Sequence, residues 1–300
     1  MSEFLVATDA HGATLDDLVT TYKSLVVSGS KDITWFVDGA VPDAIKHLQR
    51  RWSFRRVRVV AAADELKTSN FVIFLNAGDG LYRESLVNVR ETIGENASTD
   101  LIYGDAAHPT GNKAEPLSFV RRPGWSPERL RGHCYVGETI VARTEVVARA
   151  GGLTELVMQH PHDRALRLTE VAENIVRMPE LLTMAKSRDT RPSASLDAVI
   201  KHCARQKIDA DCEFDVAVPS VRVKRKLTTQ PSVAVIVPTR GTSAEVFGSK
   251  RVLVVEAVRS LFEKSTYQNF EVVVVADTPT PQNVLDTLQE IGGARLRIVN

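Results

Sequence analysis

The sequence has few cysteines and no long apolar run. No stretch of its 300 residues reaches the roughly 18–20 apolar residues that a membrane-spanning helix needs, and its first residues show no basic region followed by an apolar one. The cysteines, Cys134, Cys203 and Cys212, are odd in number and widely spaced, which fits neither a disulfide framework nor a zinc site. We therefore expect buried or incidental thiols in a reducing, cytoplasmic compartment.

An excess of charge of one sign is also lacking. The 38 Lys and Arg residues offset 37 Asp and Glu residues, so there is no electrostatic case for nucleic acid as the main ligand. No Gly-x-Gly-x-x-Gly motif follows the first apolar run, which argues against a Rossmann dehydrogenase. The hydrophobic content of 43% is ordinary for a globular protein, and the length predicts about two domains.

Short apolar runs alternate with segments of helical periodicity. The runs at 4–8, 33–39 and 70–80 are apolar on both faces, as expected for parallel strands that helices cover on both sides. Apolar residues at helical spacing predict a helix over 15–26, with Thr14 as its cap. We therefore predict an α/β fold with a mostly parallel sheet flanked by helices.

A weak internal repeat indicates two related units. The order strand, polar turn, helix, strand and Asp occurs near the N-terminus and again from residue 232 onward. The polar segment 187–195 is the best candidate boundary. We expect a first domain over 1–190, a connector of a helix and a short β excursion over 191–230, and a second unit over 231–300.

Five segments carry motifs that belong together. They are SVAVIVPTRG (232–241), SLFEKSTYQNFEVVVVAD (260–277), FVIFLNAGDGLYRESL (71–86), DLIYGD (100–105) with GWSPERL (124–130), and AGGL (150–153) with HDRALRL (162–168). Together they resemble family 2 glycosyltransferases of the GT-A fold, in particular the tandem enzymes of bacterial O-antigen and surface-polysaccharide synthesis. The resemblance implies one whole but degenerate GT-A copy, followed by the opening half of a second, truncated copy.

The resemblance implies transfer of a sugar from a nucleotide-sugar donor to a glycan or lipid-linked acceptor in cell-surface polysaccharide synthesis. It implies a donor at the carboxyl ends of the parallel strands, with Mg²⁺ or Mn²⁺ against the diphosphate. The alternative is a non-catalytic GT-A module that serves as a docking or acceptor-binding platform, so enzyme activity stays open. The basic stretch 221–227 is either a solvated hairpin or a contact to anionic lipid at the inner face of the membrane.

Four residues match positions that contact the nucleotide in the family. Asp38 matches the nucleotide-contacting Asp of the first unit, and its alternative is a simple Asp-Gly turn. Asp277 is the equivalent in the second unit, beside Thr239 and Arg240. Arg240 would either meet a phosphate or cap the sheet edge.

The metal motif of the first unit is reduced to one charge. Family members show two or three carboxylates in a short turn, whereas residues 76–79 read Asn-Ala-Gly-Asp and keep only Asp79. One carboxylate and a neutral amide hold a divalent ion poorly. Asp79 is therefore either a weak metal ligand or an ordinary turn residue.

The catalytic-base motif is degenerate as well. Pro161 stands at the family's usual base position, and Asp163 matches the carboxylate that follows it. Asp163 is either catalytic or a cap at the start of a helix, a position that Asp suits. His160 or His162 could substitute as the base, because histidine titrates near neutral pH.

The sequence ends at Asn300, directly after a predicted strand at 296–299. A sheet that stopped there would expose an apolar edge. We expect a piece of a longer tandem enzyme or, if the chain is whole, a homo-oligomer that covers this edge.

Overall fold

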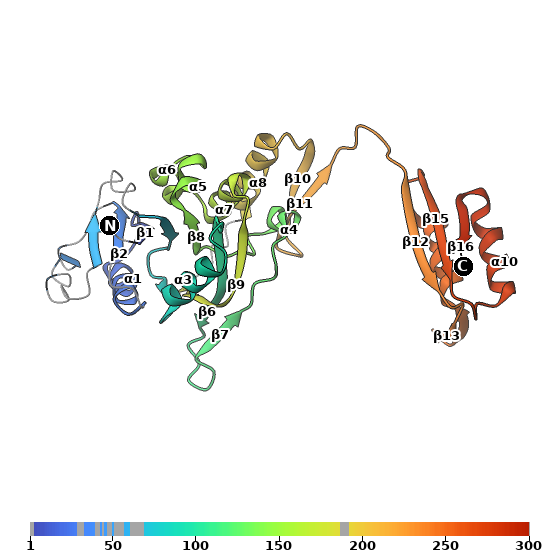
Figure 1. Ribbon diagram of the computed structural model, residues 1–300, viewed down its shortest axis with the longest axis horizontal. Coiled ribbons are helices and arrows are strands. Elements are labelled where there is room, and N and C mark those ends of the chain that lie inside the picture. The colour runs from blue at the N-terminus through green and yellow to red at the C-terminus, as the bar shows by residue number, and fades with distance from the viewer. Residues whose placement is uncertain are drawn as a thin grey trace. The chain divides into compact units, whose positions relative to one another are not determined.

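The computed structural model describes residues 3–28, 33–39, 43, 45–46, 50, 57–60, 69–186 and 192–299. The chain divides into two compact units, Met1–Lys226 and Leu227–Asn300 (Figure 1). Both are built from strands and helices, so the predicted α/β class is confirmed. Among the described residues, no helix has the length and apolar character to cross a membrane.

The first unit is built on one nine-stranded sheet of order β3-β2-β1-β4-β8-β6-β9-β5, with β7 beside β6. Four neighbouring strands are parallel: β1 (Phe4–Asp9), β2 (Ile33–Asp38), β3 (Val57–Val60) and β4 (Phe71–Phe74). The others are β5 (Gly80–Leu81), β6 (Leu101–Pro109), β7 (Leu117–Val120), β8 (Ile140–Arg143) and β9 (Ile175–Met184). Strand β8 pairs antiparallel with β4, so β8 begins beside the end of β4.

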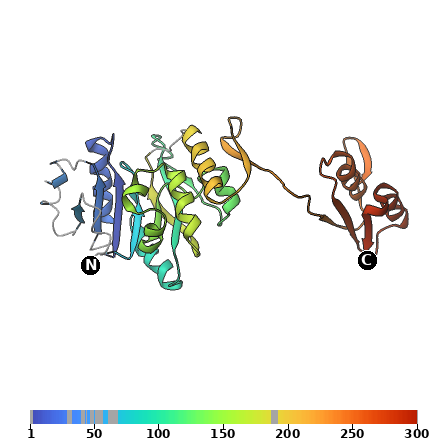
Figure 2. The same ribbon diagram turned by 90° about the horizontal axis from the view of Figure 1, so that it is seen from above.

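Helices cover both faces of this sheet (Figures 1 and 2). On one face lie α1 (Leu15–Val27) and α3 (Ser85–Glu95), and on the other α5 (Thr144–Arg149), α6 (Leu153–Met158) and α7 (Pro161–Val171). Alternate residues of β1 enter the two cores: Phe4 and Val6 join one, and Leu5 and Ala7 the other. This explains why the central strands are apolar on both faces.

Helix α1 begins where the sequence predicts. Thr14 forms a capping box with Asp17, in which the Asp17 backbone N–H donates to Thr14 Oγ1 at 3.2 Å and the Thr14 N–H donates to Asp17 Oδ2 at 3.1 Å. Leu18, Tyr22 and Leu25 form its buried face. These contacts fix the helix beside the turn that follows β4, because Thr21 Oγ1 accepts from the Gly78 N–H at 3.0 Å.

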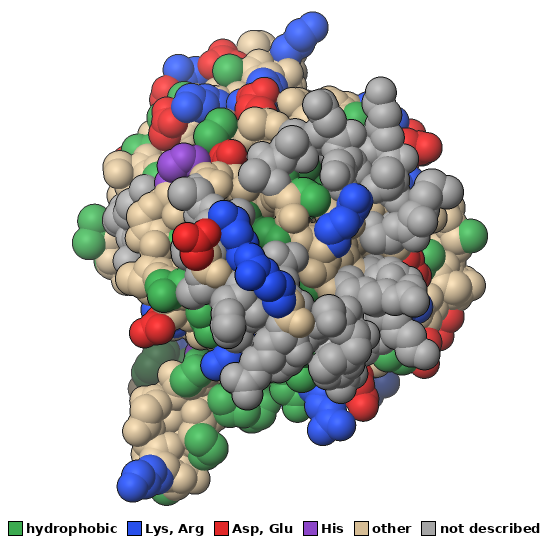
Figure 3. Space-filling view, turned by 90° about the vertical axis from the view of Figure 1, so that its left-hand side faces the viewer, with side chains coloured by type: hydrophobic (Ala, Val, Ile, Leu, Met, Phe, Trp, Pro, Cys, Tyr) green, Lys and Arg blue, Asp and Glu red, His purple; other side chains and the backbone are tan. Residues whose placement is uncertain are grey.

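The segment 192–226 packs against the rest of the first unit. Helix α8 (Pro192–Arg205) lies on α7, and the hairpin of β10 (Ala210–Asp215) and β11 (Ser220–Arg225) lies against α8 and α4 (Pro127–Gly132). Val221 and Cys203 from this segment are buried in the same core as α7. On the face seen in Figure 3, acidic and basic side chains of the described residues lie interspersed, in keeping with the balanced charge.

The second unit has a parallel sheet of order β12-β15-β16. Its strands are β12 (Val233–Thr239), β15 (Phe270–Ala276) and β16 (Leu296–Val299), and its helices are α9 (Leu253–Lys264) and α10 (Gln282–Gly292). A hairpin of β13 (Ser243–Val246) and β14 (Ser249–Val252), which the sequence analysis did not predict, precedes α9.

Candidate functional site

The carboxyl ends of β1 and β2 bring three ligand-type side chains together. Asp9 and Asp38 are the last residues of their strands and lie opposite each other in register. His11 follows, with Nδ1 at 2.8 Å from Asp9 Oδ1 and 4.0 Å from Asp38 Oδ2. One ligand atom from each residue lies within 4.8 Å of the other two, so the group could hold a metal ion. The sequence analysis named Asp38 only, although Asp9 ends its strand in the same way.

The electrostatics of this group are those of an acidic edge. The hydrogen bond from His11 to the Asp9 carboxylate, followed by the charge of Asp9, raises the pKa of His11. Asp38 Oδ2 is buried and has no hydrogen-bond partner among the described residues. A buried oxygen without a donor is uncommon in proteins and calls for a ligand or an ion. This donor set therefore fits a hard cation or the polar edge of a ligand.

Asp79 lies on the turn after β4 and is only 2% exposed. Its Oδ1 accepts the Lys186 backbone N–H at 2.6 Å. Burial is the main cause that raises the pKa of Asp79, to about 7, and the charge of Glu138 adds to it. A single buried carboxyl group that is already bonded to the backbone fits a divalent ion poorly on its own.

Glu138 is a carboxylate that the sequence analysis missed. It stands just before β8, whose first residue, Ile140, pairs with Phe74 at the end of β4. The side-chain amide of Asn76 donates to Glu138 Oε2. The antiparallel pairing therefore places Glu138 at the turn that carries Asp79.

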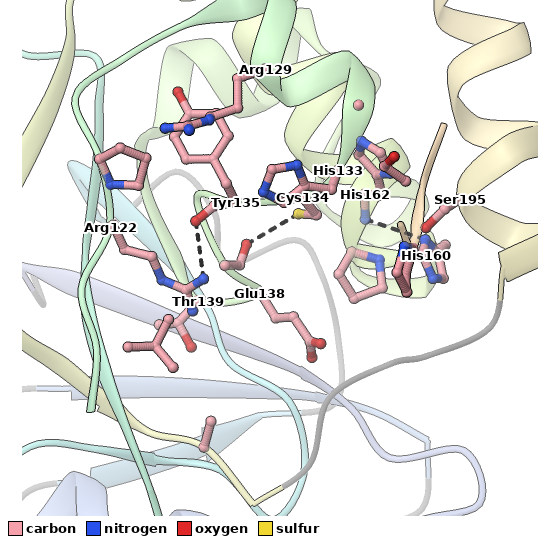
Figure 4. Close-up of a pocket in the computed structure, with 18 of the residues that line it drawn as sticks. Arg122, Arg129, His133, Cys134, Tyr135, Glu138, Thr139, His160, His162 and Ser195 are labelled. Carbon is pink, nitrogen blue, oxygen red and sulfur yellow. Dashed lines mark hydrogen bonds between the residues drawn. The ribbon is translucent and has the colours of Figure 1, made fainter. Parts of the chain in front are cut away.

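Asp79 and Glu138 both line a cavity of about 1040 Å³. This volume suits a ligand of drug or nucleotide-sugar size. Three further segments contribute lining residues: Arg121, Arg122, Arg129, His133 and Tyr135 around α4, His160, Pro161 and His162 at the start of α7, and Ser195, Phe214, Val216 and Ser220 from the segment 192–226. In Figure 4, Arg122 and Arg129 flank Tyr135 on one side, His160 and Ser195 lie on the other, and Glu138 extends between them.

Two buried polar atoms on the lining have no hydrogen-bond partner within the described part of the chain. They are Thr139 Oγ1 and His162 Nδ1, in residues that are 3% and 0% exposed. Burial lowers the pKa of His162 to about 4, so its ring is neutral. Its Nε2 lies 2.6 Å from the Leu130 carbonyl and donates there, which leaves Nδ1 as an acceptor. These atoms favour a polar ligand in the cavity.

Asp163 is not among the residues that line this cavity. Its side chain is 4% exposed, and its oxygens accept from Arg167 Nε at 2.8 Å and from an Arg205 terminal nitrogen at 3.3 Å. The contacts of Asp163 are therefore those of a structural ion pair between α7 and α8, and its catalytic role stays a prediction. The neighbouring His160 and His162 do line the cavity.

In the second unit, the three residues expected to contact a nucleotide lie together at the carboxyl ends of β12 and β15. Arg240 Nε donates to Asp277 Oδ2 at 2.8 Å. The Asp277 N–H donates to the Thr239 carbonyl at 2.8 Å, and Thr239 Oγ1 accepts from the Gly241 N–H at 3.0 Å.

No protein-family model matches the chain. Several solved structures are similar to it. S. aureus TarS 1–349 has 13% identity and a TM-score of 0.48, covering 67% of this chain and 64% of its own. TarS 1–349 in complex with UDP-GlcNAc has 11% identity and a TM-score of 0.46, with coverages of 67% and 66%. The mannosyltransferase PcManGT from Pyrobaculum calidifontis, in complex with GDP-Man and Mn²⁺, has 11% identity and a TM-score of 0.46, with coverages of 68% and 64%.

A sequence relative covers nearly the whole chain. The O-antigen biosynthesis protein RfbC of Myxococcus xanthus is 28% identical over 96% of this chain. The aligned part is 24% of RfbC, so the chain spans about a quarter of the length of this relative. Over almost all of its residues, the chain is thus similar to one part of a longer protein of O-antigen biosynthesis.

Proposed function

We propose that the unit Met1–Lys226 is a glycosyltransferase domain of bacterial surface-polysaccharide synthesis. It moves a sugar from a nucleotide-sugar donor to a glycan or lipid-linked acceptor. The observation that carries this proposal is the cavity of about 1040 Å³ that begins at the turn after β4. Open α/β sheets bind their ligands at this carboxyl edge. The similarity to an O-antigen biosynthesis protein over 96% of the chain supports the same class.

On the donor side, Asp9, His11 and Asp38 are the proposed contacts. The buried Asp38 Oδ2 is available to accept a hydrogen bond from a nucleotide base or ribose. The same three residues would hold Mg²⁺ or Mn²⁺, since their ligand atoms lie within 4.8 Å of one another. When bound, such an ion neutralises charge on the diphosphate leaving group. Asp79 is proposed to hold the turn in place rather than to bind the ion, because its carboxyl group already accepts a hydrogen bond from the Lys186 backbone N–H.

On the acceptor side, Glu138 is the proposed general base. It lines the cavity, the Asn76 amide donates to its Oε2, and a carboxylate in this place can take a proton from an acceptor hydroxyl. Pro161, at the family's base position, lines the cavity without an acidic group. In the second unit, Thr239, Arg240 and Asp277 are proposed to contact a nucleotide.

A second candidate is an acceptor-binding or docking platform without catalysis. It is favoured by the internal contacts of the two carboxylates expected to act in the first unit. Asp79 accepts from the Lys186 backbone, and Asp163 is paired with Arg167 and Arg205. This candidate predicts that the cavity binds an acceptor while no nucleotide-sugar is turned over.

A thermal-shift panel of nucleotide-sugars, with and without Mn²⁺ or Mg²⁺, tests the proposal. A donor at 100 times its Kd stabilises the folded state by about 2.7 kcal/mol. We expect one nucleotide-sugar to raise the Tm, and Asp38→Asn to reduce this shift while the exposed control Asp16→Asn does not. Release of free nucleotide in the presence of an acceptor then separates the transferase from the platform. If no nucleotide-sugar raised the Tm, the transferase proposal would fail.

A further inference from the structure

One side of the cavity is basic. Arg121, Arg122, Arg129 and His133, which we call the basic rim, line it around α4. Arg122, Arg129 and His133 lie around Tyr135, as Figure 4 shows. The rim belongs to the chain between β7 and β8, and Asp38 is not among the lining residues.

Tyr135 holds the rim in place. An Arg122 terminal nitrogen donates to the Tyr135 carbonyl at 3.0 Å, and the Arg129 guanidinium carbon lies 5.9 Å from the centre of the Tyr135 ring. The ring of His133 lies 6.0 Å from the same centre. Tyr135 itself is 4% exposed and accepts the Ser126 N–H on its hydroxyl at 2.6 Å. Arg122, Arg129 and His133 are thus preorganised before any ligand arrives.

Two arginines of the rim, Arg121 and Arg129, have no counter-charge among the described residues. Within residues 69–186 and 192–299, no ion pair includes Arg121 or Arg129. Burial lowers the pKa of His133, and the positive charges of Arg129 and then Arg122 lower it further. The lowered pKa of His133 indicates that both guanidinium groups lie close enough to its ring to disfavour the protonated form.

The nearby carboxylates are already paired elsewhere. Asp105 accepts from Arg177 at 3.2 Å, and Glu128 accepts from Arg225 at 2.6 Å. Glu138 and Asp79 also line the cavity. In the described ranges, Arg121 and Arg129 are thus lining cations without a carboxylate partner, and such groups attract an anion.

We propose that the basic rim binds a phosphate group carried by the acceptor. The guanidinium groups of Arg121 and Arg129 offer the forked N–H donors that match phosphate oxygens. This anchor leaves the neutral sugar hydroxyls of the same molecule directed to Glu138. The identification of the ligand as the acceptor rests on the proposed function. Phosphate binding by the rim does not, and it is tested without any donor or turnover.

The test uses inorganic pyrophosphate and inorganic phosphate as probes, titrated into the full chain by calorimetry. We expect Arg129→Gln and Arg121→Gln each to raise the Kd of pyrophosphate about tenfold, or about 1.4 kcal/mol, because each removes a charged donor to the phosphate oxygens. Arg83→Gln is the matched control, because it removes one charge from a side chain that is 81% exposed and outside the lining. The control should change the Kd less than twofold.

Competition with UDP and GDP distinguishes the source of the phosphate. We expect either nucleotide to leave pyrophosphate binding to the rim unchanged, while Asp38→Asn leaves it unchanged as well. Displacement of pyrophosphate by a nucleotide, together with loss in Asp38→Asn, would assign the rim to the donor diphosphate and overturn the proposal. Equal weakening in Arg83→Gln, or no binding at millimolar pyrophosphate, would overturn it too. Melting curves of each variant establish that it is folded.

Discussion

Two regions of the first unit are rich in arginine, and they use it in opposite ways. Between α7 and α8, Arg167 and Arg205 bind Asp163, and Arg205 also binds Glu170. Around α4, Arg121 and Arg129 have no carboxylate partner in the described ranges. The comparison teaches that residue type does not separate structural charges from ligand-binding charges. What separates them is whether the chain supplies the counter-charge.

The paired region shows how completely such charges are satisfied. Burial opposes ionisation of Glu170, yet hydrogen bonds from His202 and Arg205 outweigh it and hold the pKa of Glu170 below its usual value. His202 also accepts from Arg131 at 3.1 Å, so α4 joins the network. These contacts tie the segment 192–226 to the helices that form the cavity wall.

The largest effect is expected from Glu138→Gln, which tests the proposed base. Loss of a general base lowers kcat by about 10²–10⁴, whereas the Gln side chain can still contact Asn76. The measurement is sugar transfer with the donor found in the thermal-shift panel. Glu145→Gln, an exposed residue on α5, is the control and should keep full activity. Unchanged turnover in Glu138→Gln would exclude this residue as the base.

Asp163→Ala should have the next largest effect, on stability. It leaves two guanidinium groups without their buried partner, and breaking a buried pair costs about 3–5 kcal/mol, of which we expect about 3 because both arginines are partly exposed. Urea unfolding measures the loss. Asp197→Ala breaks an exposed pair with Lys201 on α8 and should cost less than about 0.5 kcal/mol. Equal losses in the two variants would contradict the structural role of Asp163.

Asp79 should make stability depend on pH. Its folded pKa of about 7 lies above its ordinary value, so the stability it contributes is complete in acid and is lost as the pH rises through 7. Between pH 5 and pH 7 this loss is about 2 kcal/mol. Asp79→Asn removes the titrating group, and unfolding curves at several pH values should show a flatter dependence. Identical slopes in the variant and the parent protein would refute the raised pKa.

The smallest effect is expected in the second unit. Arg240 and Asp277 form an exposed ion pair, with side chains 72% and 47% exposed. Arg240→Ala should therefore change stability by less than about 1 kcal/mol, as measured by thermal unfolding. A larger loss would show that this pair, like that of Asp163, supports the fold rather than a ligand.

The strands that end at the acidic edge could be predicted from the sequence. Parallel strands that are buried beneath two helix layers are apolar on both faces. The runs that end in Asp38 and lead to Asp79 show this pattern. The contact between Asn76 and Glu138 could not be predicted. It depends on which strand pairs with β4, and that choice is made by long-range packing rather than by local spacing.

The hairpin before α9 was missed for a local reason. Its turn residues, Phe247 and Gly248, both have positive φ, at 51° and 75°. Tight hairpin turns need this conformation, but Asn or Asp is its usual sequence signal and Phe is not. The basic rim was missed because its arginines look like those of α7, and only the structure shows which carboxylates are already paired.

The direction of β8 carries a consequence for the evolution of the cavity. If a strand is parallel to β4, the residue at its end lies beside the end of β4. If it is antiparallel, as β8 is, the residue before its start lies there instead. A substitution at position 138 therefore changes the side chain beside the end of β4 without changing any residue of β8. A turn with one carboxylate, Asp79, can gain a second from a distant stretch of chain by a single substitution, and the sheet need not change to accommodate it.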